Sequence, residues 1–182
     1  EPGTTWQYSY GHDVLAAVVE VISGKKFRDY VNENICQPLG MKETYFHSSE
    51  ETDKRFAPQY HFVLDNNTDG DEKKGGGYTQ SVDMSKCGGH LVRTDGVVSH
   101  RFGEEYDSGG AGACSTTEDY MRFLEGMRTA TILKPQTLEM MNSPQLTPRQ
   151  MPTYSGENDV MTYGLGVRTS KDKTKVTEFG WG

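Results

Sequence analysis

Near its start the chain carries a tyrosine at a position where a reactive side chain would be held rigidly. Tyr8 lies between a turn signal, Pro2-Gly3, and a run of apolar residues that recur at helical spacing. The run predicts an amphipathic helix over 14–22 and consists of Val14, Leu15, Val18, Val19 and Ile22. The Tyr8 hydroxyl is therefore expected on the loop that enters a packed helix, which is a rigid mount for a reactive group.

The residues around this helix predict its end and the element after it. Asp13 and Glu20 are expected on its wetter face, Gly24 suits the left-handed residue that ends a helix, and Lys25-Lys26 complement the helix dipole. A second short helix should stop before Pro38, because the residue ahead of a proline avoids helical angles. Its apolar positions are Phe27, Tyr30, Val31 and Ile35.

Other residue types that could do chemistry give weaker patterns. Residues 65–70 match the first half of a calcium-binding loop, but Gly76 stands where a bidentate glutamate is required. A solvated acidic turn is the better interpretation, so no metal is expected. The histidines are not paired at metal-ligand spacing, and the widely spaced cysteines favour separate reduced thiols. These residues are His12, His47, His61, His90, His100, Cys36, Cys87 and Cys114.

The middle of the chain is polar and glycine-rich, and the second half regains periodicity. Residues 47–110 predict loops with short strands, one of them around Tyr60 to Leu64. A capping-box pattern at 115–118 predicts a helix through Met127, and Pro135 suits the first turn of another.

The last residues predict an antiparallel hairpin. Its strands are expected over 163–169 and 176–179, joined by the polar residues 170–175.

Composition sets outer limits. The 182 residues are enough for one domain with a core. The net charge is −7 with acidic and basic residues interspersed, so no basic stripe offers itself to phosphates and no nucleic acid partner is expected. No apolar run approaches the roughly twenty residues that cross a bilayer, so no membrane span is expected. The sequence indicates no particular compartment.

Several segments, taken in order, resemble the motifs of the penicillin-recognising serine hydrolases. The segment Tyr8-Ser9-Tyr10 and the helix after it are similar to the second active-site motif. Residues 108–123 look like the family's glycine-rich turn and following helix, and 163–167 like the strand before its third motif. Phe-Gly-Trp-Gly at 179–182 resembles that motif in the Trp-Gly-Gly form of the esterase-like branch. The order and spacing of the motifs, rather than any one of them, indicate the family.

The resemblance implies acyl transfer through a serine ester. In that family a Ser-x-x-Lys serine attacks a carbonyl, a tyrosine and the lysine move the proton, and two backbone N–H groups bind the oxyanion. Tyr8 falls on the tyrosine position and is the implied catalytic residue. A phenol with a pKa near about 10 needs a nearby cation to act at neutral pH. The alternative for Tyr8 is an aromatic ring packed at a helix entrance.

The resemblance also implies substrate-binding residues, namely Tyr10, Trp181 and Gly182. Tyr10 stands where the family has an asparagine, and a phenol cannot supply the paired donor and acceptor of an amide. This departure favours esters over β-lactams.

Two Ser-x-x-Lys strings occur, and neither is expected to hold the nucleophile. Ser23 and Lys26 straddle the end of the predicted helix and would not share one face. Ser170 and Lys173 are expected in a polar strand connection, where water would leave the lysine protonated and the serine unactivated. We therefore expect the chain to be a fragment of a longer enzyme whose nucleophile precedes Tyr8.

These observations predict an α+β fold, a fragment of the beta-lactamase and penicillin-binding-protein fold with a helical region and part of an antiparallel sheet. One partial domain is expected over 1–182: tyrosine loop and helices at 1–46, a polar loop-rich region at 47–107, helices at 108–145 and strands at 160–182. The intact protein should act on carboxylic esters or on β-lactam or acyl-peptide substrates without a cofactor. The fragment alone should be inactive and should self-associate; the alternative is a non-catalytic binding module.

Overall fold

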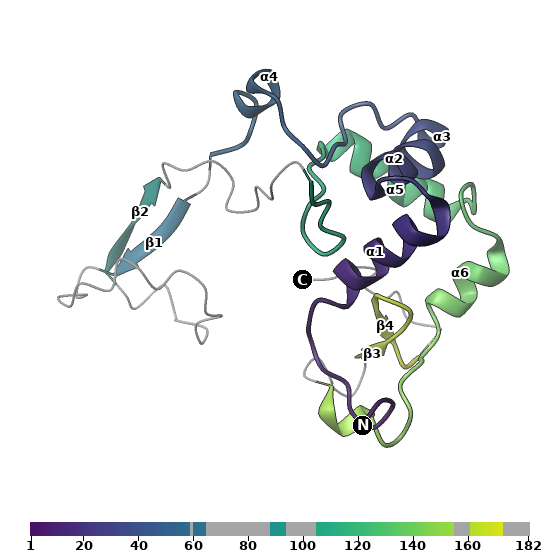
Figure 1. Ribbon diagram of the computed structural model, residues 1–182. Helices are drawn as coiled ribbons and strands as arrows, with labels where there is room; N and C mark the ends of the chain where they lie inside the picture. The colour runs from purple at the N-terminus through teal and green to yellow at the C-terminus, as the bar shows by residue number, and fades with distance from the viewer. Residues whose placement is uncertain (59, 65–87, 94–104, 155–160, 173–182) are drawn as a thin grey trace. The chain divides into compact units, whose positions relative to one another are not determined.

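The chain forms two compact units that mix helices with small antiparallel sheets (Figure 1). The computed structural model describes residues 1–58, 60–64, 88–93, 105–154 and 161–172. The larger unit comprises Glu1–His47 and Phe102–Gly182, and the smaller one Ser48–Arg101. The predicted α+β class is confirmed. Within the ranges just given, no helix has both the length and the hydropathy that crossing a bilayer requires.

The first helix, α1, runs over Gly11–Ser23 and confirms the helix predicted from the apolar spacing. Gly24 follows it with φ at 69°, the left-handed cap that the sequence predicted. The prediction of a wetter face for Asp13 and Glu20 is wrong, because both carboxylates accept hydrogen bonds from segments packed on that face. The apolar stripe is the exposed one, namely Val14, Leu15, Val18, Val21 and Ile22.

The next helical stretch continues through the proline that was expected to stop it. α2 covers Phe27–Val31, a π-helical turn covers Asn32–Cys36, and α3 covers Gln37–Leu39. A proline ring clashes with the carbonyl four residues back in a regular α-helix, and the wider π-helical turn changes that spacing just ahead of Pro38. The stretch ends at Gly40, whose φ is 67°.

α5 spans Thr117–Arg128, as the capping pattern predicted, but its cap lies one residue later than expected. Thr116 accepts a hydrogen bond from the Asp119 backbone, whereas Glu118 pairs with Arg122 one turn on. The buried Asp119 carboxylate instead accepts from the Glu43 backbone at 2.7 Å. This contact ties the start of α5 to the segment that leaves α3.

The second half of the larger unit ends in a short hairpin. α6 covers Pro135–Met141 with its proline in the first turn, as predicted. β3, Met161–Tyr163, pairs antiparallel with β4, Arg168–Ser170. The predicted strand over 163–169 is therefore wrong. A tight turn interrupts it because Gly166 adopts a φ of 78°, and the second predicted strand, 176–179, lies outside the described residues.

The smaller unit holds a helix and a hairpin. α4, Glu50–Asp53, begins at a capping box formed by Ser49 and Thr52. β1, Tyr60–Leu64, confirms the strand predicted there and pairs antiparallel with β2, Gly89–Arg93. The calcium-like loop at 65–70 and Cys87 lie outside the described residues.

Glycines let the elements of the larger unit approach closely. A Cβ on Gly109 would lie 2.3 Å from the His12 carbonyl oxygen in α1, and one on Gly126 would lie 2.4 Å from the Leu39 side chain. Real Cβ atoms do not come this close to other atoms, so a side chain at Gly109 would require a shift of backbone, whereas one at Gly126 would require the Leu39 side chain to move. The glycine-rich segment is therefore seated directly on α1.

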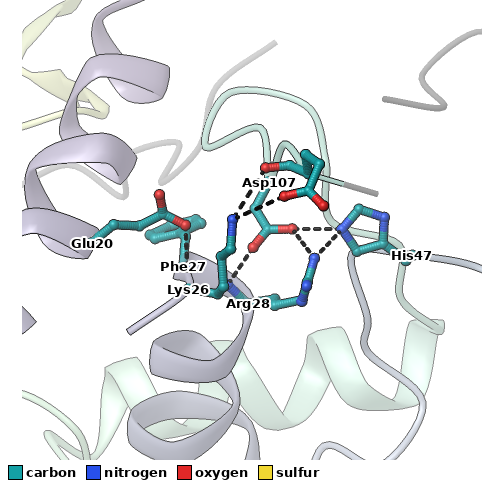
Figure 2. A network of polar contacts seen from close by, with 7 residues as sticks. Glu20, Lys26, Phe27, Arg28, His47 and Asp107 are labelled. Carbon is teal, nitrogen blue, oxygen red and sulfur yellow. Dashed lines mark hydrogen bonds and ion pairs between the residues drawn. The ribbon is translucent and has the colours of Figure 1, made fainter. Parts of the chain in front are cut away.

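A buried carboxylate joins three segments next to this glycine-rich turn (Figure 2). Asp107 Oδ1 lies 2.6 Å from His47 Nε2 and 3.1 Å from Arg28 Nη1, and its Oδ2 accepts from the Arg28 backbone at 3.0 Å. Burial alone would raise the pKa of Asp107, but the bonds from Arg28 and His47 and the Arg28 charge outweigh burial and lower it. Lys26 pairs with Glu105 beside this network. Asp107 thus stays ionised and holds the segment on α2.

The close approach of Gly109 to α1 can be tested with a methyl group. Gly109→Ala should lower the free energy of unfolding by about 1–3 kcal/mol, because the new Cβ would overlap α1 backbone atoms. Urea unfolding followed by circular dichroism measures the effect. Gly11→Ala is the matched control, since its Cβ would meet nothing within 4 Å and alanine favours helix. Equal stabilities of the two variants would contradict the seating of this segment.

Candidate active site

The loop that bears Tyr8 is held by the tryptophan two residues before it. The Trp6 backbone N–H donates to Thr153 Oγ1 at 2.7 Å. The Trp6 ring packs edge-on against Tyr154 and Tyr163, with ring centroids 4.8 and 5.6 Å away. These contacts come from a 3-10 turn, Met151–Thr153, and from β3. The entry to α1 is therefore fixed by residues that lie far away in the sequence.

A hollow of about 400 Å³ opens beside this loop. It lies between the start of α1 and the β3–β4 turn, and Tyr8 is part of its wall. The lining residues are Trp6, Gln7, Tyr8, Ser9, Gly11, His12, Leu15, Tyr163 and Gly166. His12 Nε2 lies 3.3 Å from the Gly166 carbonyl oxygen and joins the two walls.

The predicted site residues that the structure describes differ in whether they line the hollow. Tyr8 is 63% exposed and lines the hollow, as a group that meets substrate must. Tyr10 is 78% exposed, does not line the hollow and leads into α1 without a side-chain cap. Trp181 and Gly182 lie outside the described residues. The structure thus brings Tyr8, but not Tyr10, to the wall.

Three residues of the wall were missed as site residues by sequence reasoning. Tyr163 was assigned only to a strand, His12 was counted only among the histidines without metal-ligand spacing, and Trp6 was given no role. Burial raises the pKa of Tyr163, and the nearby phenols Tyr154 and Tyr8 raise it further, so its hydroxyl stays protonated. No local pattern marks these residues, because the two walls meet only through the fold.

The two candidate serines do not lie at this hollow. Ser23 is the last residue of α1, and its Oγ accepts from the Lys25 backbone, which agrees with the predicted break. Ser170 is buried at 2% exposure, so its predicted place in a water-exposed connection is wrong. Its Oγ donates to the Asp172 carbonyl at 2.9 Å, and Lys173 lies outside the described residues.

Asp13 fixes α1, and with it Tyr8, against the glycine-rich turn. Its Oδ1 accepts from Ser108 Oγ at 2.6 Å and from the Tyr106 hydroxyl at 2.7 Å. These two hydrogen bonds lower the pKa of the Asp13 carboxyl. The same bond to Asp13 raises the pKa of Tyr106. An ionised Asp13 is therefore part of the support for the site.

A larger hollow lies elsewhere in the same unit. It measures about 490 Å³ and is lined by Arg28, His47 and residues around Cys36. Burial raises the pKa of the free Cys36 thiol, which therefore stays protonated. Neither Tyr8 nor Tyr10, the predicted site residues that the structure describes, lines this hollow, whereas Tyr8 lines the smaller one, which is therefore the better candidate site.

Comparison with known proteins gives the family. A family model described as Beta-lactamase matches residues 1–182, the whole chain. The chain belongs to the beta-lactamase family. The predicted relationship and the predicted fold are both confirmed.

The relatives are acyl-transfer enzymes. Esterase EstB of Burkholderia gladioli is 35% identical over 138 residues, which are 75% of this chain and 33% of the esterase. Monacolin J acid methylbutanoyltransferase of Aspergillus terreus is 30% identical over 171 residues, 90% of this chain and 36% of the transferase. A solved structure of a simvastatin synthase variant from the same fungus matches with a TM-score of 0.70 and 26% identity, covering 93% of this chain and 41% of that one. This beta-lactamase family chain thus spans about a third of its curated relatives' length, and its family is one of acyl-transfer serine hydrolases.

The role of Asp13 can be tested through the pH dependence of stability. A depressed pKa adds stability above the ordinary value of 3.8, and that stability is lost as pH falls through the folded-state pKa. Asp13→Asn should therefore cost about 1–2 kcal/mol at neutral pH and should flatten the fall in stability below pH 3.8. Urea unfolding across pH measures both effects. Asp29→Asn, at an exposed carboxylate of α2, is the control and should leave the acid limb unchanged; an equally steep acid limb in Asp13→Asn would contradict the role.

Proposed function

We propose that the chain is part of a serine hydrolase that acts on carboxylic esters or related acyl compounds through an acyl-enzyme, with Tyr8 as a proton-transfer residue. One observation carries the proposal. Tyr8, at the position of the family's tyrosine, lines a hollow on a loop that Trp6 fixes. The esterase and acyltransferase relatives support the same reaction class.

The proposed chemistry needs groups that the hollow does not supply. A phenol is a weak base at neutral pH unless a cation stabilises its phenolate or relays its proton. Among the described lining residues none is lysine or arginine. We propose that the nucleophilic serine and its lysine belong to the part of the relatives' length that this chain does not span. The chain by itself should then bind substrate without turning it over.

The residue two positions after Tyr8 supports esters as substrates. Tyr10 replaces the asparagine that pairs with a substrate amide, and it does not line the hollow. An ester has no N–H that needs a hydrogen-bond acceptor. The absence of the asparagine side chain should therefore weaken the binding of an ester less than that of a β-lactam or a peptide.

The first expectation is inactivity of the isolated chain. It should hydrolyse neither p-nitrophenyl acetate nor nitrocefin above background, because neither Ser23 nor Ser170 lines the hollow that Tyr8 lines. A fluorophosphonate probe followed by mass spectrometry tests for covalent labelling. Stoichiometric labelling of either serine would show that the nucleophile lies within the chain.

The second expectation concerns Tyr8 in the protein extended in both directions from its gene. Tyr8→Phe removes the hydroxyl and keeps the ring, so kcat/KM for an ester should fall by roughly a hundredfold to ten-thousandfold. Tyr10→Phe is the matched control and should change KM more than kcat. Folding of both variants, checked by circular dichroism, should be unaffected.

The contrast between these variants decides the assignment. An inactive Tyr10→Phe beside an active Tyr8→Phe would place the catalytic phenol at Tyr10. Near-full activity of both would make Tyr8 a packed aromatic residue. No hydrolysis by the extended wild-type protein would favour the non-catalytic binding module.

A further inference from the structure

Part of the lining of the hollow is aromatic and held by packing within the protein. Trp6, Tyr154 and Tyr163 pack on one another with centroid separations between 4.8 and 5.7 Å and inclined ring planes. Tyr154 is only 5% exposed and lies behind the other two, since it does not line the hollow. The Trp6 backbone is bonded to Thr153, and Tyr163 belongs to β3. The two rings that face the hollow are therefore positioned before any ligand arrives.

The hollow carries no fixed charge along its described lining. It is formed by three aromatic residues, one leucine, two glycines and three polar residues, and none of these is Asp, Glu, Lys or Arg. A carboxylate or ammonium group that entered would lose its hydration without gaining an ion pair. His12 is the nearest titratable base, and its Nε2 already lies against the Gly166 carbonyl oxygen. The lining therefore disfavours charged groups.

The size and geometry of the hollow suit one ring with a short substituent. Its volume of about 400 Å³ lies within the range of small-molecule sites. Aromatic pairs prefer edge-to-face or offset arrangements at centroid separations of roughly 4.5–7 Å. Trp6 and Tyr163 already hold inclined planes at 5.6 Å, and both line the hollow.

We propose that the hollow binds an uncharged aromatic ring of the substrate, packed on Trp6 and Tyr163, so that aryl-bearing neutral esters are the preferred substrate class. This inference rests on the proposed function, because it states that the ester on which the proposed hydrolase acts carries an aromatic ring. Gln7, Ser9 and Tyr8 line the same hollow and could offer polar atoms to the ester that the ring carries. Charged acyl donors are excluded by the same wall.

Binding to the chain itself tests the proposal without requiring catalysis. The probe is N-benzylacetamide, an amide that mimics a neutral aryl ester. Two analogues serve as comparison probes. Para-(acetamidomethyl)benzoate adds one carboxylate, and N-(cyclohexylmethyl)acetamide replaces the aromatic ring with a saturated one. Proton–nitrogen correlation spectra follow the indole signals of the two tryptophans, and Trp6→Phe identifies the Trp6 signal.

The expected result is saturable movement of the Trp6 signal with N-benzylacetamide. The carboxylate analogue should bind roughly tenfold more weakly or worse, and the saturated analogue about twofold to tenfold more weakly. Tyr163→Leu should lower the affinity for N-benzylacetamide by the same twofold to tenfold and leave the affinity for the saturated analogue unchanged. Tyr154→Phe is the matched control, because it keeps the ring behind the wall, and should leave all three affinities unchanged.

Equal affinities for the neutral and charged probes, or no saturable movement at Trp6, would overturn the proposal even if Tyr163→Leu failed to fold. The result is independent of the hydrolysis test. Ring binding by this chain together with an inactive extended protein would keep the ring site but remove the catalytic proposal, and with it the ester as substrate class. Ester hydrolysis by the extended protein, without ring binding by this chain, would keep the catalytic proposal and remove this inference.

Discussion

The contact between α1 and the glycine-rich turn is the constraint on which the described site depends. Gly109 lies so close to the His12 carbonyl that a Cβ would come within 2.3 Å of its oxygen. In this arrangement Ser108 and Tyr106 donate hydrogen bonds to the Asp13 carboxylate. Steric contact and charge-assisted hydrogen bonds therefore fix the same helix face.

Tyr8 gains its position from two supports on either side of it. After it, α1 is seated on the glycine-rich turn; before it, Trp6 is bonded to Thr153 and packed on Tyr154 and Tyr163. The Tyr8 side chain itself stays largely exposed at the hollow. A reactive group is useful when its surroundings are rigid and its own atom remains accessible, and this loop meets both conditions.

The exposed stripe of α1 shows what the described part of the chain leaves uncovered. Ile22 and Val14 are 80% and 62% exposed, although they belong to the apolar pattern that predicted the helix. A contiguous apolar surface of this kind is typical of an interface. The curated relatives are about three times as long as the segment they share with this chain. The self-association predicted from the sequence stays a prediction.

Local chemistry explains why part of the structure could be predicted from the sequence. The helix after Tyr10, its Gly24 cap, the helix capped at Thr116 and the strand at Tyr60 depend on spacing, capping and left-handed glycine, which act over a few residues. The motif order also indicated the family that the family model then showed. The position of Tyr8 ahead of a helix required nothing more than its neighbours.

Long-range packing decided the rest. The spacing of apolar residues identified the apolar face of α1 but not which face is covered. The Asp13 face is covered because residues more than ninety positions away in the sequence donate hydrogen bonds to it. The strand expected over 163–169 is broken at Gly166, where the turn brings a carbonyl to His12. The aromatic wall joins Trp6 to Tyr154 and Tyr163, and the buried Asp107 joins Arg28 to His47. Local patterns were enough for the helix after Tyr10, its Gly24 cap and the position of the family's tyrosine. Which faces are buried and what surrounds that tyrosine followed from the tertiary structure, because burial depends on contacts between segments that no local pattern records.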